Sequence, residues 1–216
     1  MIVDCSENYS ILCDYVAELR DVTIQNDPLR FRKNLSRIGS VMAYEVSKSL
    51  SHQNKDVQTP LGVAPSKLLQ KQPVIASILR AGLTMHNGML ETFDRADNAF
   101  ISAFRKPHGE GDKIEVEVEY VASPSIDNKV LILTDPMLAT GSSVVLAYEA
   151  LLTRGIPSKV IVVCAIASKA GVETVKKYLP DGTDIWCAAI DDTLDQNSYI
   201  IPGLGDAGDL AYGTKI

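Results

Sequence analysis

The chain has 216 residues, a net charge of -6, 46% hydrophobic residues and 22% charged residues, a composition typical of one globular α/β domain. The acidic balance argues against nucleic acid as the main partner, because phosphate backbones are bound by clustered Lys and Arg. No uninterrupted apolar run approaches the length of a membrane span, so we expect no membrane partner.

The cysteines and the N-terminus indicate a cellular compartment. Cys5, Cys13, Cys164 and Cys187 form no Cys-x-x-Cys pair, so we expect free thiols in a reducing environment. Asp4 and Glu7 come early, and no basic segment followed by an apolar run resembles a signal peptide. We therefore predict a cytoplasmic protein.

The first 72 residues contain one clear element. Residues 11–19 allow a short amphipathic helix, and Asp27 followed by Pro28 is typical of a helix start. Apolar residues then recur at steps of three and four until position 50. Residues 57–62 are interpreted as a short edge segment that stops at Pro60, and residues 67–72 are ambiguous.

Residues 73–79 are predicted to form a buried strand, followed by the loop Arg80-Ala-Gly82 and a helix over 83–93. A guanidinium beside a glycine at the carboxyl end of a strand suits an anion, through charge and exposed N–H groups. A surface Arg at a turn is an equally good interpretation of this stretch alone.

Residues 99–104 and the alternating residues 114–120 predict two strands of a hairpin arm joined by a polar loop. Arg105 ends the first strand, and a moving arm would close this side chain over a charged ligand. The alternation of glutamates is also typical of a solvated strand face.

Residues 130–143 carry the most informative pattern. A buried strand over 130–134 ends at Asp135 and Pro136, and the small residues 139–143 precede a helical pattern. Such a loop between a strand and a helix N-terminus favours phosphate binding, and the carboxylate at the strand end suits sugar hydroxyls. The alternative is an ordinary turn capped by Ser142 or Ser143.

Strands over 159–167 and 184–190 with a helix between them, capped at Ser168, complete successive βα units. The predicted fold class is therefore α/β, with a mainly parallel sheet flanked by helices. Residues 199–209 contain three glycines, which we take to exclude strand and helix. This loop is interpreted as a backbone surface against a small flat ligand, with a flexible tail as the alternative.

With these motifs in view, the chain resembles the uracil phosphoribosyltransferase family from about residue 18 to the C-terminus. Residues 135–143 look like that family's phosphoribosyl-pyrophosphate motif, residues 78–83 like its pyrophosphate loop and residues 199–209 like its uracil-binding hood. The pairs at 20–21 and 44–45 also fall where the family has them. The resemblance implies one type I phosphoribosyltransferase domain over 1–216, with a core of about 60–190, a hairpin arm, and a small C-terminal hood formed by the N-terminal segment and 191–216.

The resemblance also implies an activity: transfer of the phosphoribosyl group of 5-phosphoribosyl 1-pyrophosphate (PRPP) to uracil, giving UMP and pyrophosphate, in a homo-oligomer that is a dimer or higher. The implied catalytic residues are Asp206 and Arg105. The implied PRPP-binding residues are Arg80, Gly82, Arg105, Asp135, Pro136, Met137, Leu138, Ala139, Thr140, Gly141, Ser142, Ser143 and Asp206, and those for uracil are Ile200, Gly205, Asp206 and Ala207.

Three departures from related sequences bear on the site. Related phosphoribosyltransferases have a second acid where Pro136 stands, and the uracil branch shares this Pro, so we expect Mg²⁺ to be carried by the substrate and not by protein carboxylates. Leu210 stands where the family usually has a basic residue, and residues 104–108 differ from the family's arm sequence.

Two other functions keep the same fold. One is a non-catalytic PRPP-sensing regulator, which a basic surface would favour. The other is a phosphoribosyltransferase for another base, although orotate would want an added cation that residues 199–209 lack. His52, His86 and His108 have no partners at metal or triad spacing, so we interpret them as structural or exposed.

Overall fold

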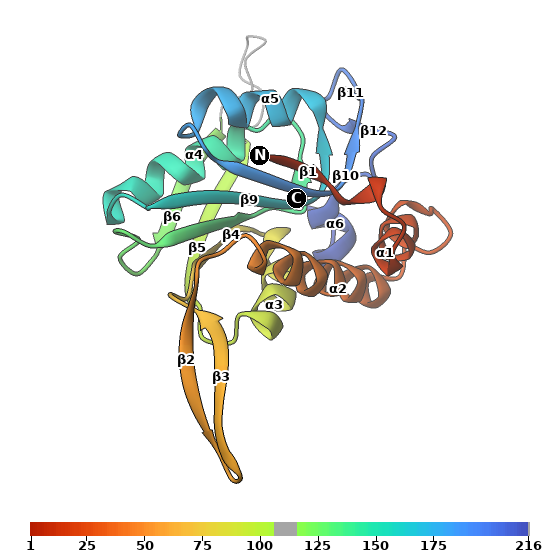
Figure 1. Ribbon diagram of the computed structural model, residues 1–216. Coiled ribbons are helices and arrows are strands. Elements are labelled where there is room, and N and C mark those ends of the chain that lie inside the picture. Colours follow the sequence, from red (N-terminus) through yellow and green to blue (C-terminus); the bar gives the residue numbers. More distant parts are fainter. Residues whose placement is uncertain (106–115, 216) are drawn as a thin grey trace.

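The computed structural model describes residues 1–105 and 116–215, and it is built on a twisted sheet with helices on both faces (Figure 1). The strand order is β1-β10-β9-β7-β4-β5-β6, with β8 also paired to β9. Among the described strands of this sheet, β6 alone runs antiparallel to its neighbour. The predicted α/β class with a mainly parallel sheet is confirmed.

The bounds of the elements are as follows. The large sheet contains β1 (Ile2–Asp4), β4 (Val74–Leu79), β5 (Asp97–Arg105), β6 (Val116–Ala122), β7 (Val130–Thr134), β8 (Met137–Leu138), β9 (Lys159–Ser168) and β10 (Asp184–Asp191). Two small sheets pair β2 (His52–Thr59) with β3 (Gly62–Leu69) and β11 (Thr193–Leu194) with β12 (Ile200–Ile201). The helices are α1 (Ile11–Arg20), α2 (Pro28–Ser47), α3 (Gly82–Thr92), α4 (Ser142–Leu151), α5 (Lys169–Tyr178) and α6 (Ala207–Tyr212), with short 3₁₀ turns at Cys5–Glu7 and Leu152–Arg154.

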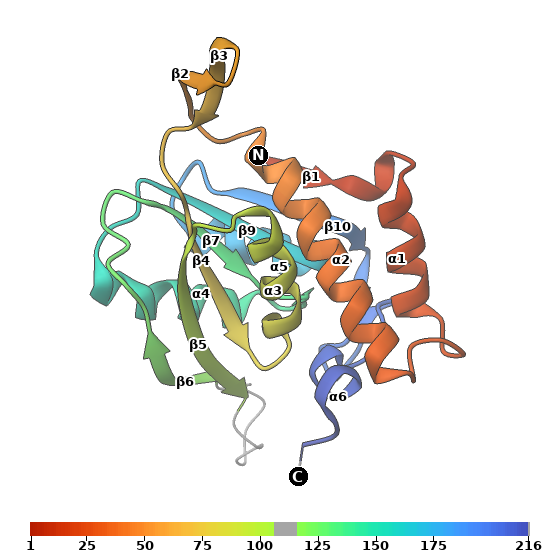
Figure 2. The same ribbon diagram turned by 90° about the horizontal axis from the view of Figure 1, so that it is seen from below.

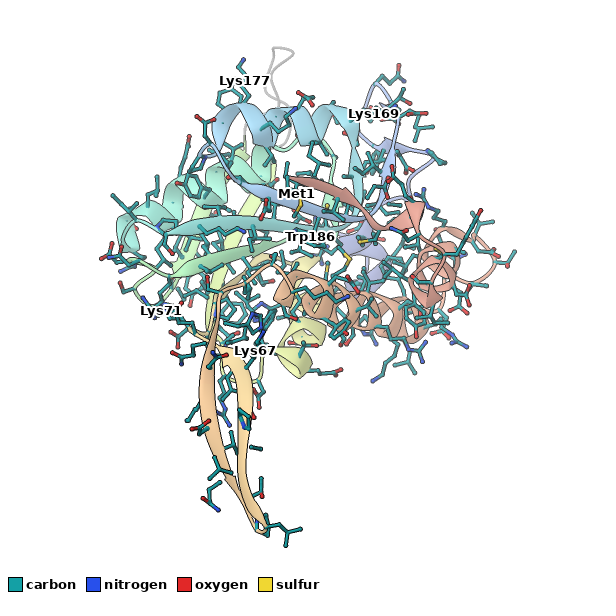
Figure 3. All side chains as sticks on the ribbon, viewed as in Figure 1. Met1, Lys67, Lys71, Lys169, Lys177 and Trp186 are labelled. Carbon is teal, nitrogen blue, oxygen red and sulfur yellow. The ribbon has the colours of Figure 1, made fainter. Side chains whose placement is uncertain are left out.

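Alternate residues of the central strands face two separate hydrophobic cores. On one face, Ile132 and Trp186 pack with residues of α1, α2, α3 and α6 (Figures 1 and 3). On the other face, Leu133 and Val162 pack with residues of α4 and α5. Burial on both faces explains why these strands appear in the sequence as continuous apolar runs.

Helix α2 begins as predicted, with Asp27 accepting from the N–H groups of Leu29 and Arg30 and Pro28 in the first turn. Helix α2 crosses α3 so closely that the backbones of the two helices are in contact. A Cβ added at Gly88 would lie 1.8 Å from the Ser36 carbonyl oxygen, and one added at Gly39 would lie 2.2 Å from that of Met85. The two glycines therefore set the distance between α2 and α3, and α3 carries the loop at Arg80.

The hairpin of β2 and β3 projects from the body of the molecule (Figures 1 and 2). The strand predicted over 57–62 does stop before Pro60, because β2 ends at Thr59, but its bounds are wrong, since β2 has eight residues and Gly62 begins β3. Most of its residues are exposed on both faces, so no apolar alternation marked it. The strand β1, at one edge of the sheet, was also not predicted.

The predicted hairpin over 99–120 is confirmed as β5 and β6, which are antiparallel neighbours within the main sheet. The polar loop between them and His108 lie outside the described residues. None of the described helices is long and apolar enough to cross a membrane. All four cysteines are free, as predicted, and Cys164 and Cys187 lie side by side in the interior with their Sγ atoms 3.3 Å apart.

Candidate active site

The carboxyl ends of β4, β5, β7, β9 and β10 lie along one edge of the sheet, because these strands are parallel and in register. This edge therefore brings Arg80, Arg105, Asp135, Ser168 and Asp191 into one region, although they are far apart in the sequence. Figure 2 shows β4 and β5 ending on the side of the molecule where α6 lies. Open α/β sheets bind their ligands at this edge.

The loop after β7 forms a small hollow. Pro136 ends the strand, and the Asp135 carboxylate accepts a hydrogen bond from the N–H of Met137 at 3.1 Å. Gly141 has φ +83°, a left-handed conformation that lets the chain turn directly into α4. The hollow is lined by Asp135, Met137, Leu138, Ala139, Thr140, Gly141, Ser143 and Val144.

Residues at the N-terminal end of α5 contact the loop that forms this hollow and support it. The Ser168 hydroxyl donates to the Ala139 carbonyl at 2.6 Å and accepts from the N–H of Gly171 at 2.9 Å. A Cβ at Gly171 would lie 2.5 Å from the carbonyl oxygens of Leu138 and Ala139. The loop is therefore braced by backbone contact that leaves no room for a side chain.

The helix that follows the hollow has no side-chain cap. Its N-cap is Gly141, and Ser142 and Ser143 are the first residues of the helix, so the interpretation as a Ser-capped turn is wrong. Helix α3, which begins after Arg80, also lacks a side-chain cap. Helices α1, α2, α5 and α6 are all capped by Ser or Asp. The positive ends of the two helix dipoles thus lie at the predicted anion sites, and the Ser142 N–H of α4 donates to the Thr140 hydroxyl at 3.4 Å.

Arg80 lies between β4 and α3, after a cis peptide bond at Leu79–Arg80. Its guanidinium is paired with the Asp209 carboxylate at 3.0 Å and donates to the Gly213 carbonyl at 3.3 Å. At Gly82, a Cβ would lie 2.8 Å from the Ser77 hydroxyl and 2.9 Å from the Thr134 carbonyl oxygen. Arg80 therefore belongs to a loop that packs closely on β4 and β7, and it already faces an anionic partner.

Residues 202–206 form a loop that runs from β12 to α6. The Ile201–Pro202 bond is cis, and Gly203 and Gly205 have φ values of +56° and +90°. The expectation that the glycines exclude strand and helix is wrong, because Ile200 and Ile201 form β12 and Gly208 lies inside α6. The flexible-tail alternative is also wrong, since Ile200, Leu204, Ala207 and Ala211 are buried.

The three predicted motifs meet in space. The N–H of Ala207 lies 3.4 Å from the Met137 sulfur, which joins the hood to the hollow. A Cβ at Gly208 would lie 3.2 Å from the Asp206 carboxylate and 3.8 Å from the Arg80 guanidinium, which joins the hood to the pyrophosphate loop. Arg105 ends β5, next to β4, and its side chain lies outside the described residues.

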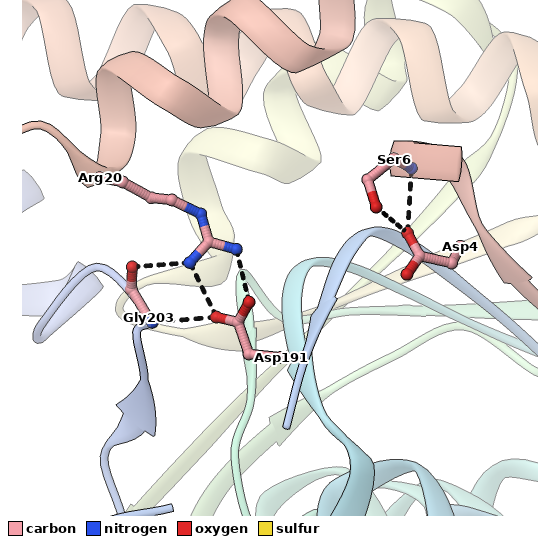
Figure 4. Close-up of polar contacts among 5 residues, drawn as sticks. All are labelled: Asp4, Ser6, Arg20, Asp191 and Gly203. Atoms are coloured by element: carbon pink, nitrogen blue, oxygen red, sulfur yellow. Dashed lines mark hydrogen bonds and ion pairs between the residues drawn. The ribbon is translucent and has the colours of Figure 1, made fainter. Parts of the chain in front are cut away.

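Several contacts at the site were not predicted from the sequence. Arg20, at the end of α1, pairs with Asp191, and both contact Gly203 (Figure 4). The hydroxyls of Thr84 and Tyr212 are hydrogen-bonded and tie α3 to α6. The sequence did contain a signal for Asp191, because this acidic residue stands at the carboxyl end of a buried strand, as Asp135 does.

His86 is the one titratable side chain of α3 that lies in the interior among the described residues. It is buried beside the Phe100 ring, and burial lowers the pKa of its imidazole. Burial therefore favours the neutral form of the ring beside the predicted anion site at the start of α3. The interpretation of His86 as structural agrees with this position.

A family model described as uracil phosphoribosyltransferase matches residues 9–214. The chain belongs to the uracil phosphoribosyltransferase family. A uracil phosphoribosyltransferase of Porphyromonas gingivalis is 53% identical over 215 residues, covering 100% of this chain and 99% of the relative. Another, from Dictyoglomus turgidum, is 42% identical over 202 residues, covering 93% and 94%.

Solved structures agree with this family assignment at the level of fold. A protein of Aquifex aeolicus superposes with a TM-score of 0.87 at 30% identity, with 100% of both chains covered. An orotate phosphoribosyltransferase of Mycobacterium tuberculosis, solved in complex with PRPP, has a TM-score of 0.53 at 10% identity, covering 84% of this chain and 96% of that one. The second comparison shows that this family shares the type I phosphoribosyltransferase fold.

Proposed function

We propose that the chain transfers the phosphoribosyl group of PRPP to uracil, releasing UMP and pyrophosphate. The observation that carries this proposal is the meeting of three segments in a family member: the hollow after β7, the loop at Arg80 and the hood loop before α6. Each segment suits one part of the two substrates, namely the 5′-phosphate, the pyrophosphate and the base.

In this proposal the 5′-phosphate binds in the hollow formed by residues 137–143, against the uncapped N-terminus of α4. The Asp135 carboxylate accepts hydrogen bonds from ribose hydroxyls. The pyrophosphate binds at Arg80 and Gly82, with Arg105 approaching from the end of β5. Uracil is held by backbone groups of Ile200, Gly205 and Ala207, and by Asp206.

The reaction is a displacement at the anomeric carbon, whose transition state has oxocarbenium character. The chain's part is to orient N1 of uracil toward this carbon and to stabilise the departing pyrophosphate with Arg80 and Arg105. Asp206 caps α6 by accepting from the N–H of Asp209 at 2.9 Å, so its carboxylate is held at the start of this helix. No general base is assigned.

Mg²⁺ is the cofactor that the family resemblance implies. Within residues 1–105 and 116–215, no three His, Cys, Asp or Glu side chains are grouped to hold a metal ion, so the donor set fits a cation held chiefly by substrate oxygens. Mg²⁺ carried by PRPP would neutralise pyrophosphate charge, and Asp206 would face the PRPP or its metal. A homo-oligomer and a cytoplasmic location stay predictions.

A base panel tests the proposal. The purified chain is incubated with PRPP, Mg²⁺ and one of uracil, cytosine, orotate or hypoxanthine, and nucleotide is measured by chromatography. We expect UMP from uracil and no nucleotide above background from the other bases. Nucleotide from another base instead would identify a different transferase, and PRPP binding without any nucleotide would favour the sensing regulator.

A further inference from the structure

Arg20 and Asp191 form a partly buried, bidentate ion pair beside the hood loop (Figure 4). The Nη1 and Nη2 atoms of Arg20 each donate to one carboxylate oxygen of Asp191 at 2.8 Å. The side chain of Asp191 is 8% exposed and that of Arg20 is 23% exposed. The two residues are 171 positions apart, so this pair joins the end of α1 to the end of β10.

The same two side chains hold both polar groups of one peptide residue in the loop. Arg20 Nη1 donates to the Gly203 carbonyl oxygen at 3.0 Å, and the Gly203 N–H donates to Asp191 Oδ2 at 2.9 Å. Gly203 has φ +56°, and a Cβ there would lie 2.0 Å from the Ile200 carbonyl oxygen. Gly203 therefore has a conformation that leaves no room for a side chain, and Arg20 and Asp191 hold both of its polar groups in it.

A second side chain from the same N-terminal segment holds the next residue. The amide of Gln25 donates to the Leu204 carbonyl at 3.2 Å and to the Leu19 carbonyl at 2.8 Å. The carbonyl groups of residues 203 and 204 are thus both turned toward the N-terminal segment. The peptide groups on either side, at Ile200 and at 205–207, are those assigned to the base.

Stability alone does not account for an ion pair of this kind. The cost of desolvating two charges offsets most of their attraction, so a buried pair contributes little net free energy of folding compared with apolar side chains of similar size. A bidentate guanidinium–carboxylate pair fixes the orientation of both side chains, because each partner binds the other at two points. Here that geometry is transmitted to Gly203 and from it to the loop.

We propose that Arg20 and Asp191 are positioning residues for the base, which act through Gly203 to hold the backbone of residues 200–207 in the shape that accepts uracil. The proposal rests on the proposed function, since it assumes that this loop is the base site. It gives the N-terminal segment a part in base selection, and it predicts that loss of the pair affects the base and not PRPP.

The first measurement is steady-state kinetics of Asp191→Asn and Arg20→Lys, with Asp192→Asn as the matched control. Asp192 is the next residue, and its pair with Lys169 is on the surface, with 77% of the Asp192 side chain exposed. We expect the KM for uracil to rise tenfold or more in Asp191→Asn and by less in Arg20→Lys, which keeps the charge but loses the fork. The KM for PRPP stays within twofold, and the control behaves as wild type.

Amide hydrogen exchange of residues 203–207 provides a readout that does not depend on activity. We expect faster exchange in Asp191→Asn and Arg20→Lys than in Asp192→Asn, at a temperature where circular dichroism shows all variants folded. Equal exchange, or a KM for uracil within twofold of the control, overturns the proposal. If the wild-type chain makes no UMP, the proposed function fails while the exchange comparison still decides whether the pair holds the loop. If Asp191→Asn does not fold, Arg20→Lys decides both questions.

Discussion

The hollow after β7 and the hood loop before α6 have similar sequences of small residues but are held in different ways. The hollow is braced by its immediate surroundings, through Ser168 and Gly171 at the start of the next βα unit. The hood loop is held by Arg20, Gln25 and Met137 from distant parts of the chain, and by Asp191, which lies 12 positions before Gly203. The loop proposed to bind phosphate is therefore supported mainly by the next βα unit, whereas the loop proposed to bind the base depends on contacts from several parts of the chain.

The largest expected effect is at the hood loop, with Gly205→Val. Gly205 has φ +90°, and its nearest neighbour for an added Cβ is Leu210 at 3.8 Å, so a valine would be strained and would project into the space assigned to uracil. We expect the kcat/KM for uracil to fall by about 100-fold or more, the loss of roughly 3 kcal/mol of transition-state binding.

The matched control for that change is Gly182→Val. Gly182 has φ +86° and open space around it in the turn before β10, so it carries the same backbone strain away from the site. Both variants should lose similar stability in thermal unfolding. Unimpaired use of uracil by Gly205→Val would remove residues 199–209 from the base site.

A smaller effect is expected at the hollow, with Gly171→Ala. The added methyl would lie 2.5 Å from two backbone carbonyl oxygens, so either the loop or α5 must move, at a cost of about 1–3 kcal/mol in stability. We expect the KM for PRPP to rise while the KM for uracil changes less. Gly62→Ala, where nothing lies within 4 Å, is the control in both kinetics and denaturant unfolding.

The smallest of the three effects is expected for Asp135→Asn. An asparagine keeps an oxygen for the N–H of Met137, so the loop and the unfolding midpoint should be preserved. Loss of charge weakens the hydrogen bonds from ribose hydroxyls, and we expect the KM for PRPP to rise by about tenfold. Kinetics equal to those of wild type would show that Asp135 does not bind the sugar.

The helices and buried strands were predictable because their signals are local. Asp27 and Pro28 mark the start of α2, and apolar residues spaced three and four apart mark its buried face. The apolar runs of β7 and β9 are buried on both faces, and few other structures bury such runs. The hairpin of β2 and β3 was missed for the opposite reason, since neither face packs against the body.

The βα order, the loop of small residues that follows Asp135 and, through three motifs, the family of the chain could all be inferred from the sequence. The contacts of Gly203, the pairing of Arg80 with Asp209 and the position of Ser142 and Ser143 inside α4 are seen only in the folded chain. The physical reason is the sequence separation over which each kind of interaction acts. Caps, turns and periodicity act over a few residues, but a contact across 171 positions exists only once the parallel strands have brought their carboxyl ends to one edge.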